Sequence, residues 1–188
     1  MAQYYYVVAS LPALVYDMEK PPALEYFLDA CETGVSPEDM AMIRKTHLAD
    51  VEPEEGESGV LGRWRNWERN LRNKLARLRA AKKSIDAEQF VRENADPHVE
   101  DKAAREAFEE ASPLAAEDLL DWVRWTYLEE LEQGHYFDID RLVVYYLKLQ
   151  LLWRKRSFDK ERGAGVFSEI VGKISNEDYS SFKNVVEA

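Results

Sequence analysis

Glu132 and His135 are the residues whose spacing comes closest to a known metal-binding motif. A Glu-x-x-His pair on a helix is the spacing by which di-iron bundles hold their metal, but that chemistry needs a second pair and two further inward carboxylates. The chain has only three histidines, at His47, His98 and His135. Gly134 lies inside the motif and is expected to end the helix. The pattern therefore indicates a surface turn, with no metal ion and no cofactor.

Motifs that frame an active site are missing from the rest of the sequence. There is no glycine-rich nucleotide fingerprint, no phosphate-binding loop, no Gly-x-Ser-x-Gly and no Cys-x-x-Cys. We therefore expect a protein that is not an enzyme. An enzyme of unrecognised type remains an open hypothesis, and it would require a deep pocket that holds ionisable groups with shifted pKa values.

The stretch Arg63–Lys83 is basic, with Glu68 as its one acidic residue. Together with Trp64 and Trp67, it has the residue types of an RNA-binding helix. A helical wheel argues against that interpretation, because the basic residues divide between two flanks of the apolar stripe and form no single basic face. One flank carries Arg65, Arg69 and Arg72, and the other carries Arg63, Lys74 and Arg77.

Three other interpretations of this basic stretch remain. It could complement the acidic stretch Asp96–Asp140, form a solvated flank, or bind an acidic protein. The formal net charge of −11 and the pI of about 4.9 also argue against nucleic acid or anionic lipid as a partner of the whole chain.

A helix over residues 137–154 is apolar on nearly every side. Such a helix must be covered on several sides, by its own domain or by a partner. The helices expected at Ala116–Leu131 and Phe167–Ile174 are two candidate covers. Arg141, Lys148 and Lys155 are spaced by seven and form a narrow polar strip, which we expect to be its solvent-facing or partner-facing edge.

Trp122 and Trp125 lie well off the apolar stripe of the preceding helix. They could anchor a partner protein, or they could pack on the next helix, which is the interpretation we favour. The candidate partner interface is the set of residues Trp122, Trp125, Arg141, Lys148, Arg154 and Lys155.

The remaining pattern predicts an all-α fold, an irregular bundle of about six to eight helices with a short extended N-terminal segment. Residues Tyr4–Pro12 form that segment, or else a helical turn docked on the core. One domain is expected over residues 1–188, and if it divides into lobes these would be 1–83 and 84–188. The predicted helical stretches are 24–31, 37–48, 61–78, 87–94, 97–111, 113–133, 139–157, 167–174 and 176–186.

The single cysteine, Cys31, allows no intramolecular disulfide and favours an intracellular setting. No signal peptide or membrane span is expected, since no apolar run approaches the roughly 20 residues that a spanning helix needs. A cytoplasmic location follows as an expectation.

Two stretches resemble an uncharacterised bacterial family whose members are encoded beside V-type ATP synthase subunits. They are Tyr4–Pro12 and the block Phe137–Arg154, which continues to Gly163. The block is also similar to the coupling subunit of V/A-type ATPases, which is designated C in archaea and bacteria and d in eukaryotes. There a Phe-Asp start leads into a Tyr-Leu-Leu-Lys helix with a later Arg, and the matching residues here are Phe137, Asp138, Tyr146, Leu147, Lys148 and Arg154.

The resemblance implies an all-helical, non-catalytic subunit or accessory protein of a bacterial V-type ATPase. It would be cytoplasmic or peripheral to the membrane, with other ATPase subunits as its partners. The coupling subunit connects the rotor shaft to the membrane ring, but this chain is much shorter and shows no threefold repeat. A reduced coupler and an accessory factor with a different role are both open, and a helical adaptor for some other protein is the alternative.

Overall fold

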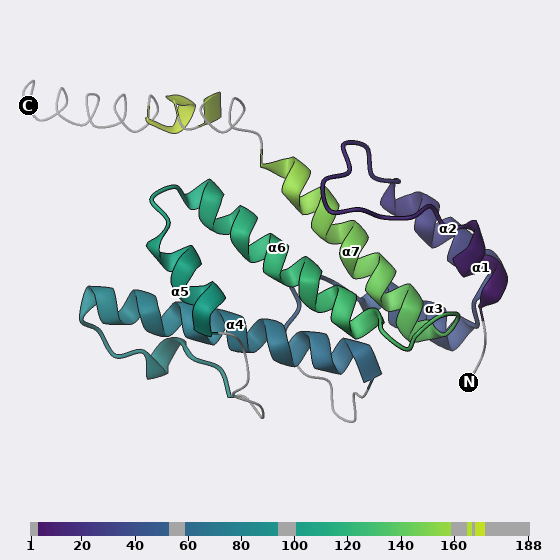
Figure 1. Ribbon diagram of the computed structural model, residues 1–188, viewed down its shortest axis with the longest axis horizontal. Helices are drawn as coiled ribbons and strands as arrows, with labels where there is room; N and C mark the ends of the chain where they lie inside the picture. The colour runs from purple at the N-terminus through teal and green to yellow at the C-terminus, as the bar shows by residue number, and fades with distance from the viewer. Residues whose placement is uncertain (1–3, 53–58, 94–100, 159–164, 167, 172–188) are drawn as a thin grey trace, which may run out of the picture. The chain divides into compact units, whose positions relative to one another are not determined.

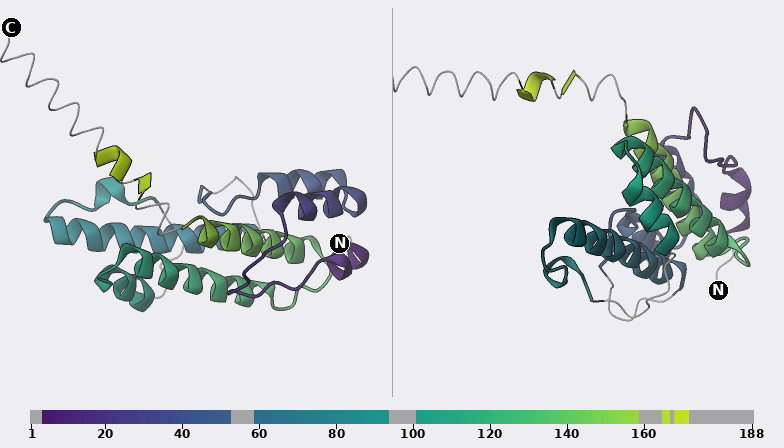
Figure 2. Two further views of the ribbon diagram at one scale, coloured as in Figure 1. Left: turned by 90° about the horizontal axis from the view of Figure 1, so that it is seen from above. Right: turned by 60° about the vertical axis from the view of Figure 1, so that its left-hand side comes forward.

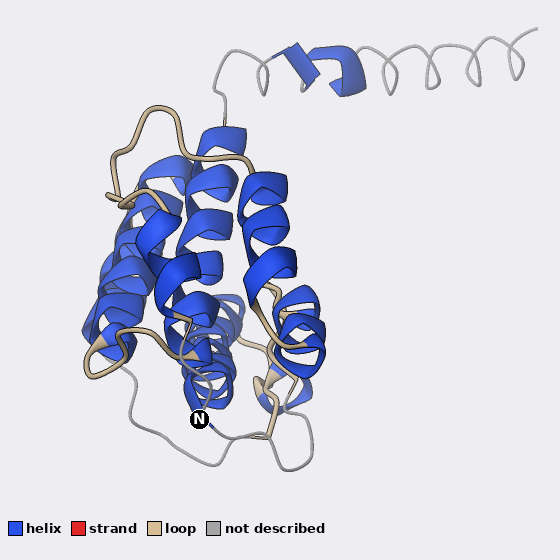
Figure 3. Ribbon diagram, turned by 90° about the vertical axis from the view of Figure 1, so that its right-hand side faces the viewer, coloured by secondary structure: helices blue, strands red, loops and turns tan. Residues whose placement is uncertain are grey.

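The computed structural model describes residues 4–52, 59–93, 101–158, 165–166 and 168–171, and their regular structure is entirely helical (Figures 1 and 3). The predicted all-α bundle is confirmed. Its described elements are α1 (Tyr5–Ser10), α2 (Leu24–Gly34), α3 (Pro37–Lys45), α4 (Gly59–Lys83), the 3-10 helix η1 (Glu88–Phe90), α5 (Asp101–Glu109), α6 (Pro113–Glu132) and α7 (Ile139–Ser157).

The chain forms two compact units, Met1–Lys155 and Arg156–Ala188. The lobe boundary suggested at residues 83 and 84 falls inside the first unit. Of the predicted helix 167–174, residues 168–171 are helical, while Phe167 and residues 172–174 lie outside the described part, as does the predicted helix 176–186.

Local sequence signals account for several helix boundaries. The hydroxyl of Ser36 accepts a hydrogen bond from the backbone N–H of Asp39 (3.3 Å), and Pro37 occupies the first turn of α3. Asp138 accepts one from the N–H of Arg141 (3.0 Å) and so caps α7 as expected. Gly134 has a φ of +86°, the left-handed conformation that commonly ends a helix, and it follows Gln133, the C-cap residue of α6.

Helix α7 lies between two hydrophobic cores. Toward α4, α5 and α6 it contributes Val143, Val144, Leu147, Leu151 and Leu152. On its other side Leu142, Tyr145 and Leu149 pack with buried residues of α1, α2 and α3. Figures 1 and 2 show α6 beside α7, and α2 on the opposite side of α7. This burial on both sides is what its apolar sequence requires.

The N-terminal residues form the short helix α1, which corresponds to the docked helical turn, the second of the two alternatives for this segment. Val7 is buried in the core that α1 shares with α2. The two helices approach closely at Gly34, where an added Cβ atom would lie 2.4 Å from the Val7 Cγ2 atom. Packing on α2 and α7 thus overrides the strand preference of these residues.

Other elements are shorter than predicted. Helix α3 ends at Lys45, not near Leu48, and the predicted helix 87–94 is reduced to the three-residue η1. No described helix is both long enough and apolar enough to cross a membrane.

The thiol of Cys31 provides a test of this core. Cys31 is fully buried on α2, and burial raises its pKa from 9.0 to about 12. The unfolded chain loses this proton near pH 9 while the folded chain keeps it, so the stability that the thiol contributes is complete below about pH 9 and declines as the pH rises toward 12. We expect no alkylation of native protein by iodoacetamide at about pH 8, and prompt alkylation in urea, as measured by mass spectrometry.

Cys31→Ala serves as the control for the pH dependence. Between about pH 9 and pH 11, the free energy of unfolding of the wild type should fall more steeply than that of the variant. Rapid alkylation of the native thiol, or parallel pH profiles, would contradict the buried position.

Candidate functional site

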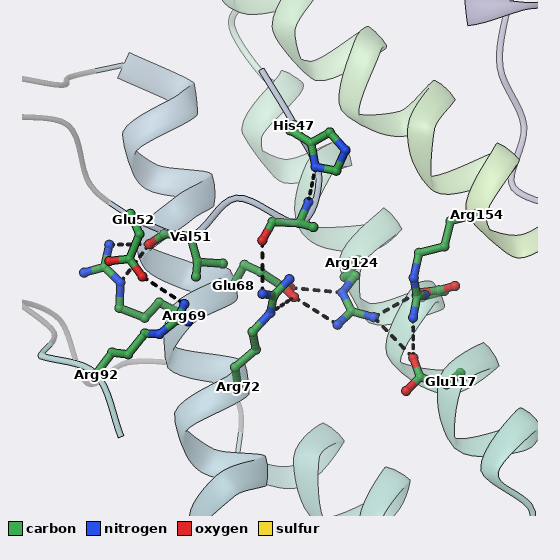
Figure 4. Close-up of polar contacts among 12 residues, drawn as sticks. His47, Val51, Glu52, Glu68, Arg69, Arg72, Arg92, Glu117, Arg124 and Arg154 are labelled. Atoms are coloured by element: carbon green, nitrogen blue, oxygen red, sulfur yellow. Dashed lines mark hydrogen bonds and ion pairs between the residues drawn. The ribbon is translucent and has the colours of Figure 1, made fainter. Parts of the chain in front are cut away.

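A buried ionic network joins α4, α6 and α7 (Figure 4). At its centre is Glu68 of α4, which is 1% exposed. Arg124 of α6 holds both carboxylate oxygens of Glu68 in a bidentate pair, with its Nε and Nη2 atoms each 3.0 Å away. Arg72 adds a bond from Nε to Oε1 at 2.8 Å. Planar, bidentate pairs of this kind are the strong form of the ion pair.

The network continues through Asp121 of α6, which is fully buried. Its Oδ1 atom accepts hydrogen bonds from Arg124 Nη1 (2.9 Å) and from Arg154 of α7, and Arg154 Nη2 also donates to Glu117 (2.6 Å). Burial raises the pKa of Asp121, although Arg154 and Arg124 oppose the shift. Burial by itself would lower the pKa of Arg124, but Glu68 and Asp121 outweigh it and raise that pKa. Arg124 is therefore permanently charged.

The three basic residues predicted on one flank of α4 all have partners within the chain. Arg65 pairs with Asp50 (2.9 Å), and Arg69 donates to the backbone oxygens of Val51 and Glu93. Arg72 contacts Glu68 and the backbone oxygen of Ala49. This flank holds the segment that precedes α4.

A pocket of about 380 Å³ opens beside the network. Helices α2, α4, α6 and α7 and the segment after α3 all contribute to its lining, which consists of Leu24, His47, Leu48, Ala49, Glu68, Arg72, Arg124, Tyr146, Gln150 and Arg154. Gln150 fixes one wall, because its amide accepts from Leu48 N (2.9 Å) and donates to Thr46 O (3.0 Å). Arg154 is the one lining residue that belongs to the predicted partner interface. The pocket itself was not predicted, since its residues are scattered along the chain.

The polar strip on α7 is not the exposed edge that its spacing suggested. Lys148 is buried, pairs with Glu132 (2.5 Å) and lies over the ring of Trp125. Arg141 pairs with the same Glu132. Lys155 pairs with Asp17 at the surface (3.0 Å). The strip is interrupted because Lys148 packs against Glu132 and Trp125 of α6.

The two tryptophans of α6 behave differently. Trp125 is 3% exposed and donates from Nε1 to Glu129 (2.8 Å), so it packs inside the fold as favoured. Trp122 is 52% exposed, with its ring edge against Tyr16 (5.0 Å between centroids). Only Trp122 of this pair presents a large surface that a partner could cover.

Glu132 and His135 do not act together. Glu132 binds the cations of α7, while His135 Nδ1 lies 2.8 Å from Asp138 Oδ2 in the turn between α6 and α7. Within the described ranges no three His, Cys, Asp or Glu residues are grouped as a metal site would need.

Four aromatic side chains lie exposed at one end of the first unit, and we call them the aromatic end surface: Tyr5, Tyr6, Tyr136 and Phe137. Tyr5 contacts both Phe137 (4.7 Å between ring centroids) and Tyr6 (5.8 Å). Tyr6 and Tyr136 are 87% and 71% exposed. Both aromatic runs are visible in the sequence, but nothing in their spacing indicates that they meet.

Residues 103–178 match a family described as "Protein of unknown function (DUF2764)". The matched range covers less than half of the chain and includes α6 and α7. The description assigns no activity or partner to the family. No curated protein and no solved structure matches the chain.

The ionic network generates a stability prediction. Glu68→Ala would remove the bidentate partner of the buried Arg124 and leave it with Asp121 (2.9 Å) and the more distant Glu117 (4.0 Å). Breaking a buried pair from one side costs about 3–5 kcal/mol. Glu32→Ala is the matched control, because Glu32 pairs with Arg44 where both side chains are more than half exposed. The control should cost less than about 1 kcal/mol. Urea denaturation measures both, and equal losses would show that the network does not support the fold.

Proposed function

We propose that this protein is a non-catalytic subunit or accessory protein of a bacterial V-type ATPase, which works by binding other subunits. The observation that carries the proposal is the contact between the two stretches that resemble the ATPase-associated family. Tyr4 N donates to Phe137 O (2.5 Å), and the Tyr145 hydroxyl donates to Pro12 O (3.0 Å). The two stretches, which lie near opposite ends of the first unit's sequence, are thus hydrogen-bonded to each other.

The aromatic end surface lies where these two stretches meet. Exposed tyrosine and phenylalanine side chains that lie next to one another are typical of protein interfaces, since they offer a large apolar area with hydroxyl groups for hydrogen bonding. Because the surface combines residues of both resembling stretches, we propose it as the face that contacts the ATPase. A coupling role between rotor shaft and membrane ring is the more specific form of this proposal.

The test is a pull-down from detergent-treated membranes of the native host with the tagged full chain. We expect V-type ATPase subunits among the captured proteins, identified by mass spectrometry. The double variant Tyr6→Ala/Tyr136→Ala should lower their recovery at least about tenfold, since aromatic hot-spot residues each contribute about 2 kcal/mol or more. Both side chains are largely exposed, so the variant should keep its fold.

Phe90→Ala is the matched control, because Phe90 is an exposed aromatic residue (55%) on η1. It should leave the recovery unchanged. Recovery of a different protein with no ATPase component would favour the helical adaptor instead. An ATPase that is purified mildly from the host and lacks this chain would contradict the proposal.

A further inference from the structure

The pocket beside the ionic network has cationic walls in an acidic protein. Arg72, Arg124 and Arg154 line it, and Glu68 is the only carboxylate among the described residues that line it. Both oxygens of Glu68 are occupied by Arg72 and Arg124, so that it offers little negative charge to a molecule in the pocket.

Two further carboxylates balance the charges of Arg124 and Arg154 from outside the pocket lining. Asp121 and Glu117 hold Arg154, and Asp121 also holds Arg124, but neither acid lines the pocket. They fix the positions of the two guanidinium groups without entering the space in front of them. The arginines are thereby preorganised, which lowers the entropic cost of binding a ligand.

Arg72 keeps hydrogen-bond donors that a bound ligand could use. A guanidinium group has five N–H donors. Arg72 uses Nε on Glu68 and Nη1 on Ala49 O (3.1 Å), and its Nη2 atom has no acceptor among the described residues. The phenol of Tyr146 and the imidazole of His47 add polar groups to the same lining.

The lining also includes the apolar residues Leu24, Leu48 and Ala49, and Gln150, whose amide is engaged by Leu48 N and Thr46 O. The volume of about 380 Å³ falls in the range of small-molecule sites and exceeds what a bare oxyanion would fill. We propose that this pocket binds a small organic anion, whose carboxylate or phosphate group accepts a hydrogen bond from Arg72 in the field of Arg124, while its apolar part lies against Leu24 and Leu48.

Isothermal titration calorimetry at low ionic strength tests this with three probes: phenyl phosphate, benzoate and inorganic phosphate. We expect one saturable site for phenyl phosphate or for benzoate, and the tighter of the two identifies the oxyanion. Inorganic phosphate should bind at least about tenfold more weakly than phenyl phosphate, because it lacks the apolar part. Equal binding of the two phosphates would overturn the organic ligand.

Two variants locate the site. Arg72→Gln should weaken binding at least about tenfold through the loss of charged hydrogen bonds. Ala49→Phe keeps every charge but fills the pocket, and should abolish binding. Arg77→Gln, on the same helix but outside this lining, should bind like the wild type.

Circular dichroism and urea denaturation confirm that each variant is folded. If neither organic probe binds saturably up to about 10 mM, the proposal is wrong. It is also wrong if both Arg72→Gln and Ala49→Phe bind like the wild type, or if Arg77→Gln weakens binding as much as Arg72→Gln does. This outcome does not bear on the ATPase proposal, whose test uses a different surface and readout.

Discussion

The burial of α7 on both sides is the constraint on which the rest of the first unit depends. A helix with apolar residues all round leaves a large area in contact with water unless two layers cover it, and each fully buried Leu or Val contributes about 1.5–3 kcal/mol to that preference. The unit meets this need with α4, α5 and α6 on one side and α1, α2 and α3 on the other. The remaining helices are arranged around α7, and the long segment between α1 and α2 passes along it, with Tyr145 held to Pro12.

The ionic network connects α7 to α6, and α6 to α4, within this packing. Hydrophobic contacts alone fix how deep a helix lies but define its rotation and register weakly. Glu68, Arg124 and Asp121 are buried, so each must find its partner or leave a desolvated charge in the interior. In the observed packing Arg124 connects α6 to Glu68 of α4, and Arg154 connects α7 to Asp121 and Glu117 of α6. A change in the register of these helices would have to break these contacts, whatever their net contribution to stability.

The sequence predicted the helices best where a cap or a strong apolar period marks them. Ser36-Pro37, Gly134 and Asp138 set boundaries through local hydrogen bonds and backbone conformation, and local signals can be read from neighbouring residues. The sequence left Tyr4–Pro12 open between an extended segment and a helical turn, and it misplaced Lys148 at an exposed edge, because tertiary contacts decide the state of both. Packing against Gly34 favours a helix for the first, and Glu132 with Trp125 allows the second to be buried. The pocket and the aromatic end surface could not be predicted at all, since each unites residues from distant parts of the chain.

Helix α7 belongs to both hydrophobic cores, and this affects the order in which the protein folds. The core of α1, α2 and α3 is closed by Leu142, Tyr145 and Leu149, which the ribosome adds long after Phe27 and Cys31. Until α7 emerges, the N-terminal helices expose the apolar faces that they later bury. Nascent chains in this state are prone to aggregate or to engage chaperones. Completion of the first unit therefore depends on its last helix, and contacts between residues this far apart in sequence slow folding through the entropy of loop closure.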